Sequence, residues 1–411
     1  MKIAFLVSSF PKLSETFILN QITGLIDLGH EVEIFAFKKP GENKIQGDVR
    51  KYNLMNRVHY LTAPKSKIKR IFKATNIIIK NFYRNPIIIL KSLNFFKYGK
   101  KALSLSLLFE IYPFLNNEFD ILHCHFGPNG KIGAILKDIG VIKGKLLTSF
   151  HGTDMSKHIL KRGRDTYNFL FKTGDSFLPI SNYWKKVLIE LGCPENKIIV
   201  HRMGIELKKF NLKKEPHNDE TPKLISVGRL VEKKGFEYAI RAVSVLIKEF
   251  PDIKYNIIGD GPLKEQLNNL ISELGLEKNV KILGYKIYEE VIKFLYESDI
   301  LLAPSITSQD GDQEGIPIVL MEAMAIGLPV ISSFHTGIPE LVLNGESGFL
   351  VSEKDVNSIA NNIRYLIKNP EMRESMGLKG RKIIEQNHNV EILNKQLVRI
   401  YSDLLEKTSI G

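Results

Sequence analysis

The sequence has few cysteines and no long apolar stretch, and both shortages narrow the class of protein. Its two cysteines, Cys124 and Cys193, provide neither a framework of disulfide bridges nor a set of metal ligands. No run of about 18 apolar residues is present, so a transmembrane helix is not predicted. The opening MKIAFLVSSF has one lysine and no small-residue cleavage site, which is typical of a first strand rather than a signal peptide. These shortages favour the reducing cytoplasm.

Length and periodicity predict two domains of the α/β class. A chain of 411 residues exceeds what one hydrophobic core usually supports. Short β-branched runs alternate with helical patterns, which is typical of parallel sheets flanked by helices. We expect strands near residues 2–8, 30–37, 119–126, 145–150, 176–180, 197–202, 223–229, 253–259, 279–284, 299–305, 329–333 and 348–352. This pattern predicts two open, doubly wound domains, with a ligand bound in the cleft between them.

The composition also suggests where the domains begin and end. We expect an N-terminal Rossmann-like domain at residues 1–205 and a second one at residues 223–388. Residues 206–222 are polar and without apolar periodicity, which is linker composition. The last segment, residues 389–411, contains a predicted helix with no strand after it. We expect that helix to cross back to the N-terminal domain.

The net charge of +13 is concentrated in the first half of the chain. Residues 1–215 hold 36 Lys/Arg and 17 Asp/Glu, a balance of +19, whereas residues 216–411 hold 22 and 28, a balance of −6. The densest part, residues 49–109, contains 14 Lys/Arg and no acidic residue. It belongs to a basic helical insertion at about residues 49–115, where cations alternate with Phe, Ile, Leu and Tyr.

Three interpretations of this insertion remain open. Cations beside apolar residues at helical spacing indicate an amphipathic helix on an anionic membrane surface. The same pattern also suits a solvated helical face whose apolar side belongs to the core. Nucleic acid is the least favoured partner, because no nucleic-acid-binding motif accompanies the charge.

Glu314 and Glu322 stand eight positions apart in the segment 304–327, PSITSQDGDQEGIPIVLMEAMAIG. Pro317 suits the first turn of a helix, so we expect the helix to begin near Gly315. Its free amides would then point into the preceding loop, where a phosphate group binds well. Carboxylates accept hydrogen bonds from sugar hydroxyls, so the pair suits a nucleotide sugar. The alternative is two ordinary helix glutamates.

Two further motifs follow predicted strands. Arg229 and Lys234, in SVGRLVEKKG, could clamp a diphosphate and stabilise the negative charge on a departing nucleotide without a metal ion. His151, in FHGTDM, could donate a hydrogen bond to a sugar hydroxyl, and Asp154 could orient its ring or bind a hydroxyl. The alternatives are a lysine-rich surface loop and a histidine that makes only local hydrogen bonds.

Other patterns are less specific. IIGDGPL lacks the third glycine of a dinucleotide fingerprint, but Gly261 could let a nucleotide approach closely. His123 and His125 share one strand face, which favours hydrogen bonding in the core over a metal site. Ser14 is a plausible helix N-cap, and Glu340 could reach the cleft or favour a helix start.

In this order and spacing, HGTD, SVGRLVEKKG, GDGPL and EGIPIVLMEAMAIGLPVI resemble the retaining glycosyltransferases of family 4, which have the GT-B fold. SETFI and HCHFG are most similar to bacterial enzymes of capsule, exopolysaccharide and colanic acid assembly. The resemblance implies an acceptor-binding first domain and a second domain that binds the nucleotide sugar. This sequence departs from the family pattern in the loop PKLSET after the first strand, where many relatives have a glycine-rich loop.

The resemblance also implies individual roles. Arg229 and Lys234 would hold the donor diphosphate, and Glu322 would bind the ribose hydroxyls. Glu314 would contact the donor sugar near its 3-hydroxyl, and His151 would contact the transferred sugar. The remaining contacts, to the sugar and the β-phosphate, would come from the backbone amides of Gly315 and Ile316.

Together these patterns predict a retaining hexosyltransferase. The expected donor is a nucleotide sugar, UDP-linked, and the acceptor is a hydroxyl of a lipid-linked or growing cell-surface saccharide, including one carried on a polyprenyl lipid. No metal or cofactor is expected, and no nucleic acid partner. We expect a cytoplasmic protein attached peripherally to the inner face of the membrane. The alternatives are a basic binding module without catalysis, or another nucleotide-sugar enzyme such as a phosphorylase or an epimerase.

Overall fold

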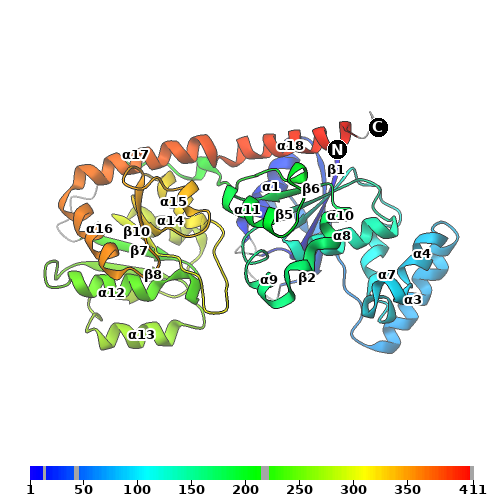
Figure 1. The fold of residues 1–411 in the computed structure, drawn as a ribbon, viewed down its shortest axis with the longest axis horizontal. Coiled ribbons are helices and arrows are strands. Elements are labelled where there is room, and N and C mark those ends of the chain that lie inside the picture. The colour runs from blue at the N-terminus through cyan, green and yellow to red at the C-terminus, as the bar shows by residue number, and fades with distance from the viewer. Residues whose placement is uncertain (13–14, 41–45, 214–221, 408–411) are drawn as a thin grey trace.

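The computed structural model describes residues 1–12, 15–40, 46–213 and 222–407. These residues form two parallel sheets of six strands, one in each half of the chain (Figure 1). The predicted N-cap Ser14 lies outside the described residues, as do residues 214–221 of the predicted linker.

The N-terminal sheet has the strand order β3-β2-β1-β4-β5-β6. Its strands are β1 (Lys2–Ser9), β2 (Glu31–Lys38), β3 (Val58–Tyr60), β4 (Ile121–His125), β5 (Lys145–Phe150) and β6 (Ser176–Pro179). The order reverses between β1 and β4, which pair in parallel with Ile3 opposite Ile121. Ligands of open sheets bind beyond the carboxyl ends of the strands at such a switch point.

The C-terminal sheet repeats this topology with the order β12-β11-β10-β7-β8-β9. Its strands are β7 (Lys223–Val227), β8 (Lys254–Ile258), β9 (Val280–Ile282), β10 (Ile300–Ala303), β11 (Val330–Ser333) and β12 (Gly348–Val351). Here the switch point lies between β7 and β10, where Leu224 pairs with Ile300. The predicted fold class, α/β with two doubly wound domains, is confirmed.

Burial on both faces explains why these segments are continuous apolar runs. Every residue of β4 and of β10 is buried, as expected for central strands covered by helices on both sides. The helices that cover the sheets include α1 (Thr16–Asp27), α8 (Gly127–Ile139), α11 (Asn182–Glu190), α12 (Phe236–Leu246), α13 (Lys264–Glu273), α14 (Tyr288–Tyr296), α15 (Ile318–Ala325) and α16 (Val356–Lys368).

Two strand predictions differ from the structure. Residues 197–202 form no ladder strand, because only Ile198 makes an isolated bridge, to Phe177, at the edge beyond β6. Two backbone hydrogen bonds, from Ile199 and His201 to carbonyls of β6, hold this extended run in place. Conversely, the prediction missed β3, whose three residues are too few to produce an alternating pattern.

Two long helices at the C-terminus run along one side of both domains (Figure 1). α17 (Pro370–Asn387) lies on the C-terminal domain, and α18 (Val390–Glu406) lies against α1 of the N-terminal domain. The Asn394 side-chain amide donates to the carbonyl of Asn20 at 3.1 Å. Ile205 pairs with the segment between the two helices, donating to the His388 carbonyl at 2.9 Å. The chain therefore crosses between the domains twice, at adjacent points.

A group of short helices separates β3 from β4 and lies at the end of the N-terminal domain remote from the C-terminal domain (Figure 1). These are α3 (Lys67–Phe82), α4 (Pro86–Ser92), α5 (Phe95–Tyr98), α6 (Lys100–Leu103) and α7 (Ser106–Ile111), preceded by α2 (Gly47–Lys51) before β3. Their inner sides join the core through buried residues that include Ala74, Ile77, Ile89, Leu107 and Leu108. Within residues 1–12, 15–40, 46–213 and 222–407, no helix has the length and apolar character needed to cross a bilayer.

Candidate active site

The loop between β10 and α15 carries Glu314, and it remains non-helical for longer than the sequence predicts. α15 begins at Ile318 rather than near Gly315, and Pro317 is its N-cap, with an extended ψ of 124°. The hydroxyl of Thr336 donates to the carbonyls of Glu314 and Gly315, both at 2.9 Å. These two bonds hold the preceding residues out of helical geometry.

This arrangement leaves backbone donors free beside Glu314. The amides of Gly315 and Ile316 donate to no residue that the structure describes. They precede the N-terminus of α15, where unpaired amides and the helix dipole favour an anionic group. These amides could therefore donate hydrogen bonds to an anionic group or to a neutral oxygen atom.

Glu314 forms a cluster with two lysines, which we call the charged cluster: Lys233, Lys234 and Glu314. Its Oε1 atom lies 3.2 Å from Nζ of Lys234 and 3.5 Å from Nζ of Lys233. Burial alone would raise the pKa of Glu314, but the two lysines outweigh that effect and place the pKa below its ordinary value. Glu314 is therefore a carboxylate at neutral pH.

The backbone of Glu314 is anchored as firmly as its side chain. Its amide donates to Nε2 of His335 at 3.1 Å, so that Nδ1 of the same ring carries the proton and donates to Glu353 at 2.6 Å. Glu353 in turn accepts from the amide of Thr307 at 2.9 Å. The sequence gives little indication of His335 or Glu353, because their role depends on β11 lying between β10 and β12.

Arg229, Lys234 and Gly261 lie in loops that follow β7 and β8. The Lys233 carbonyl accepts from the amide of Ile306 at 2.9 Å, which fixes the lysine loop beside the loop after β10. Arg229 is exposed and forms no ion pair with any residue in the described part of the chain. Gly261 lies against Leu230, the residue that follows Arg229. The carbonyl oxygen of Leu230 would be 2.6 Å from a Cβ atom at Gly261. The close approach at Gly261 is therefore one of backbone to backbone.

Glu322 occupies a separate, more enclosed position on α15. Its carboxylate is buried and accepts one hydrogen bond, from the hydroxyl of Tyr288 on α14 at 3.1 Å. Burial raises the pKa of Glu322 to about 7, although the Tyr288 hydrogen bond opposes part of that increase. The structure brings Glu314 and Lys234 together, whereas Glu322 contacts Tyr288, a residue that the sequence motif does not indicate.

His151 lies where the two domains touch. Its carbonyl would be 2.3 Å from a Cβ atom at Gly315, and Gly152 has a positive φ of 123°. A Cβ atom at Gly152 would lie 2.9 Å from the amide nitrogen of Gly315. Both glycines are therefore required for the HGTD loop to approach the loop that carries Glu314.

Side-chain bonds also cross the junction. The hydroxyl of Thr153 donates to Asp312 at 2.8 Å, and within the C-terminal domain Lys233 forms an ion pair with the same Asp312 at 3.2 Å. Lys157 forms an ion pair with Asp310. These contacts place the carboxyl ends of both sheets at one interdomain junction. The sequence analysis missed all of them, although the acidic run DGDQE could have indicated a partner for the lysines.

A second set of contacts across the junction explains Glu340. Its carboxylate accepts from the amides of Asn182 at 3.0 Å and Tyr183 at 2.9 Å, at the start of α11 in the other domain. Arg202 lies 3.6 Å from the same carboxylate. Glu340 therefore favours a helix start, as one alternative proposed, but the helix belongs to the N-terminal domain.

The aromatic ring of His151 ends a row of three stacked imidazoles, which we call the histidine ladder: His123, His125 and His151. Ring centroids are 4.6 Å apart for the first pair and 5.3 Å for the second. Nδ1 of His125 lies 3.1 Å from Nε2 of His151. Beyond the other end, His123 bonds Ser149 at 2.7 Å and Tyr401 of α18 at 2.6 Å.

Asp154 does not orient the His151 ring, so that prediction was wrong. Its carboxylate instead accepts three backbone amides, from Gly127 at 2.9 Å, His151 at 3.0 Å and Gly152 at 2.9 Å. The Asp154 side chain is buried and these three amides occupy most of its accepting positions, so it faces the backbone of its own loop. Asp154 therefore shapes the loop, and His125 orients the ring.

Burial keeps the histidine ladder uncharged. It lowers the pKa of His123 and of His151 to about 3, and that of His125 well below its ordinary value of 6.5. Nδ1 of His151 and Nε2 of His125 are buried and have no hydrogen-bond partner among the described residues. The ladder therefore brings a neutral ring, not a positive charge, to the junction.

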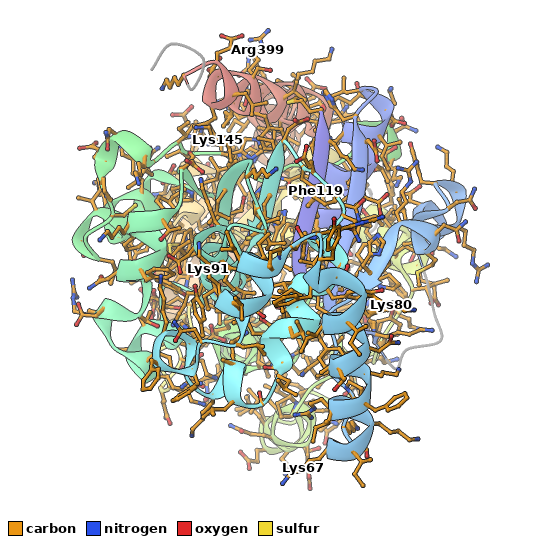
Figure 2. The ribbon with its side chains drawn as sticks, turned by 90° about the vertical axis from the view of Figure 1, so that its right-hand side faces the viewer. Lys67, Lys80, Lys91, Phe119, Lys145 and Arg399 are labelled. Carbon is orange, nitrogen blue, oxygen red and sulfur yellow. The ribbon has the colours of Figure 1, made fainter. Side chains whose placement is uncertain are left out.

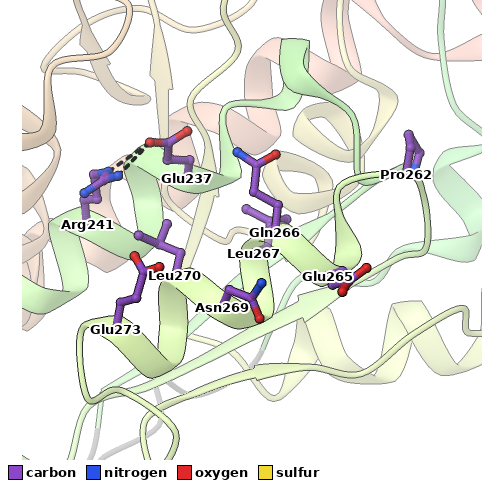
Figure 3. A pocket seen from close by; sticks show the side chains of 9 residues that line it. All are labelled: Glu237, Arg241, Pro262, Glu265, Gln266, Leu267, Asn269, Leu270 and Glu273. Carbon is purple, nitrogen blue, oxygen red and sulfur yellow. Dashed lines mark hydrogen bonds and ion pairs between the residues drawn. The ribbon is translucent and has the colours of Figure 1, made fainter.

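The described residues include no group of three or more His, Cys, Asp and Glu side chains arranged to hold a metal ion. A pocket of about 520 Å³ lies elsewhere, between α12 and α13, and Figure 3 shows its lining. Glu237, Glu265 and Glu273 line it, and its Arg241 is paired with Glu237 at 2.9 Å. That acidic lining would repel a diphosphate, and no predicted site residue lies there.

Two doubly wound domains whose strand ends meet at one junction define the GT-B class of fold. The comparisons with known proteins agree. The sequence model of Glycosyltransferase Family 4 matches residues 14–209, and that of Glycosyl transferases group 1 matches residues 208–383.

Two relatives match almost the whole chain. The amylovoran biosynthesis glycosyltransferase AmsK of Erwinia amylovora is 40% identical over 98% of this chain and 100% of its own. WcaL of Salmonella typhimurium, named as a colanic acid biosynthesis glycosyltransferase, is 38% identical over 97% of this chain and 99% of its own. The chain therefore belongs to this glycosyltransferase family, and it is a glycosyltransferase. The resemblance inferred from the motifs is confirmed.

Solved structures support the fold independently. Anabaena HepE, in complex with UDP and glucose, has a TM-score of 0.73 at 19% identity, with 98% of this chain and 99% of that one covered. Staphylococcus aureus TarM has a TM-score of 0.72 at 14% identity, with 98% and 99% covered. At these identities the likeness shows the GT-B fold alone.

Proposed function

We propose that this glycosyltransferase moves a hexose from a UDP-sugar to a hydroxyl of a saccharide in exopolysaccharide assembly. The observation that carries the proposal is the charged cluster beside the free amides of Gly315 and Ile316. Cations, a carboxylate and unpaired amides together match the groups of a sugar diphosphate. The names of AmsK and WcaL support the polysaccharide context, and the UDP and glucose bound to HepE support the donor.

Each group has a role in the proposed donor complex. Lys234 and the exposed Arg229 hold the diphosphate, and the amides of Gly315 and Ile316 bind the sugar and the β-phosphate. Glu314 accepts a hydrogen bond from the sugar near its 3-hydroxyl. Since Lys234 is paired with Glu314 in the free protein, the diphosphate shares that lysine with the carboxylate when it binds.

The proposed acceptor side belongs to the N-terminal domain. The ring of His151 is uncharged and only partly buried, so it contacts the transferred sugar without attracting the phosphates. The acceptor hydroxyl belongs to a lipid-linked saccharide, including one on a polyprenyl carrier, or to a growing cell-surface chain. A neutral contact suits a sugar because the sugar itself carries no charge.

The proposed reaction retains the configuration of the anomeric carbon. The bond from the anomeric carbon to the diphosphate breaks as the bond to the acceptor oxygen forms on the same face, through an oxocarbenium-like state, and the departing diphosphate takes the proton of the acceptor hydroxyl. Glu314 stabilises and positions the sugar rather than attacking it, since two lysines already hold its carboxylate. Arg229 and Lys234 stabilise the charge on the departing diphosphate, a role that a metal ion fills in other enzymes. The reaction should therefore proceed in EDTA.

The test is a panel of UDP-, GDP- and ADP-linked hexoses with released nucleotide as the readout. We expect release from a UDP-hexose and, for Arg229→Ala, turnover lower by about 10²-fold or more. Lys264→Ala is the matched control, because the Lys264 side chain is 45% exposed and its ion-pair partner in the described part of the chain is Asp260. If no nucleotide is released from any of the nucleotide sugars, whichever saccharide acceptor is added, the result would contradict catalysis and favour a binding module. Near-normal turnover of Arg229→Ala would contradict its role.

A further inference from the structure

Helix α3 has two apolar faces, and only one of them is covered. Ala74 and Ile77 lie in the core of the N-terminal domain. On the other side, large side chains are open to solvent: Ile68, Ile71, Phe72, Ile79, Phe82 and Tyr83. Phe72 is 77% exposed, Ile68 is 82% exposed and Tyr83 is 96% exposed. Large apolar side chains exposed as a contiguous face mark an interaction surface.

These exposed residues form one continuous face of the helix. At about 100° per residue they fall within roughly 120° of one another, and the buried residues lie roughly opposite. The following helices expose apolar side chains as well: Ile87 and Leu90 of α4 and Phe96 of α5. We call these nine residues the outer face of the insertion.

Basic residues flank the outer face on one side. At about 100° per residue, Lys69, Lys73, Lys80 and Arg84 occupy a stripe roughly 60° wide beside the exposed apolar residues. All four are exposed, and in the described part of the chain none has an ion-pair partner. Figure 2 shows this end of the molecule, with Lys67, Lys80 and Lys91 on the side facing the viewer.

We propose that the outer face rests in the headgroup region of an anionic lipid bilayer, with the basic stripe on its phosphates. An exposed apolar face beside a basic stripe is the pattern of a helix that lies in a membrane surface. The sequence left open whether the apolar side of this segment belongs entirely to the core. The exposure of Phe72, Ile79 and Tyr83 favours the membrane.

Two other occupants fit the surface less well. A second copy of the chain would bring its own segment 49–109, with 14 Lys/Arg and no acid, against an identical one, and like charges would meet. A nucleic acid would satisfy the lysines but would leave isoleucine and phenylalanine side chains against phosphates. A bilayer of anionic lipid satisfies both the charges and the apolar side chains.

The proposal is tested by co-sedimentation of the full-length protein with vesicles. We expect binding to phosphatidylcholine mixed with phosphatidylglycerol, and binding weaker by about tenfold or more to phosphatidylcholine alone or at raised salt. The variant Phe72→Ser/Lys73→Gln should bind the anionic vesicles about tenfold less well. The matched control is Leu378→Ser/Lys379→Gln on α17, another exposed apolar residue followed by an exposed lysine, and it should bind like the unaltered protein.

A fluorescence arm tests insertion directly. The chain has one tryptophan, Trp184, which is 1% exposed and gives a constant background. Phe72→Trp should shift its emission to shorter wavelength when anionic vesicles are added, and Leu378→Trp should not. Circular dichroism and nucleotide release with a water-soluble acceptor should be unchanged in all four variants, which separates this proposal from the proposed catalytic function.

Several outcomes would overturn the proposal. One is equal binding of the Phe72→Ser/Lys73→Gln and Leu378→Ser/Lys379→Gln variants to anionic vesicles. Another is that the unaltered protein fails to bind both the anionic vesicles and the phosphatidylcholine vesicles. A third is an unchanged Phe72→Trp emission together with tight binding of duplex DNA or RNA, which would make nucleic acid the partner. A dimer in ultracentrifugation that Phe72→Ser/Lys73→Gln dissociates would make the face a self-interface.

Discussion

The two domains share one topology but carry opposite chemistry on their central strands. In the C-terminal domain the charged cluster joins the loops that follow β7 and β10. In the N-terminal domain β4 and the residue after β5 carry the histidine ladder, whose imidazoles are stacked and uncharged. The contrast shows that the doubly wound fold provides a location for a ligand but not its electrostatics.

The difference follows from solvent access. The side chains of the charged cluster keep about an eighth to a fifth of their surface exposed, with 13% for Glu314 and 18% for Lys234, so each charge has water and an opposite charge nearby. His123 and His125 are fully enclosed, with Tyr401 of α18 against the His123 ring, and an imidazolium there would lose its hydration without gaining a carboxylate. The charged half therefore suits phosphates, and the neutral half suits a sugar.

Removing a charge from the C-terminal half should have the largest effect on activity. We expect Lys234→Met to lower turnover by about 10²-fold or more, because the departing diphosphate loses a cation and Glu314 loses one of its two lysines. Lys233→Met is the comparison, since Lys233 lies farther from Glu314 and also pairs with Asp312. Equal turnover of Lys234→Met and the unaltered enzyme would show that the charged cluster does not stabilise the departing diphosphate.

The neutral half should respond to acid rather than to removal of a charge. Because the pKa of His125 lies well below 6.5 in the folded protein, the unfolded chain binds a proton that the folded one does not. Stability should therefore fall as the pH drops below 6.5, by up to about 2 kcal/mol for this histidine at pH 5. Urea titrations over this pH range should show a shallower decline for His125→Phe. A slope unchanged by that substitution would contradict a neutral ladder.

Glu322 should make the affinity for the nucleotide of the donor depend on pH. Burial raises its pKa to about 7, and hydrogen bonds from ribose hydroxyls would favour the ionised form, so UDP binding should release a proton. Calorimetry should show UDP affinity rising about tenfold between pH 5 and pH 7. The same calorimetric experiment on Glu322→Gln gives the part of the pH dependence that comes from protonation of UDP itself. If both proteins show the same pH dependence, Glu322 does not bind the ribose.

We expect the smallest effect, on the free energy of unfolding, from substitutions of two buried tyrosines, one in each domain. Tyr401→Phe removes the partner of Nδ1 of His123 and should lower the free energy of unfolding by about 1 to 3 kcal/mol. Tyr255→Phe should cost less, because its partner Ser226 also bonds the carbonyl of Leu302 at 2.5 Å. Urea denaturation of both variants measures the difference. A larger loss for Tyr255→Phe would show that the ladder does not depend on α18.

The sequence predicted the sheets well because central parallel strands have a simple signature. Ten or more residues of helix separate most of the short apolar runs, and eleven of the twelve expected strands exist. The run at 197–202 has the same composition as a strand but lies at an edge, where composition does not decide pairing. β3 was missed because a strand of three residues is stabilised by its neighbour β2 rather than by its own pattern.

Site prediction succeeded where a motif is local and failed where partners come from distant segments. Glu314 and Lys234 were both indicated by their motifs, and the structure places them 3.2 Å apart. Tyr288, which donates to Glu322, was not found, because no pattern connects α14 to α15. Asp154 was given a role at the His151 ring, since sequence proximity does not reveal that its carboxylate faces backbone amides.

The sequence by itself determined the class of fold, the family and the residue types needed at a sugar diphosphate site, because these depend on periodicity and on short motifs. Only the tertiary structure decided which charges are paired, which imidazoles are neutral and which apolar face of α3 is exposed. Those properties depend on solvent access and on contacts between distant segments, such as His123 and Tyr401, which are 278 positions apart. Burial and pairing are set by the packing of the whole chain, so no local pattern encodes them.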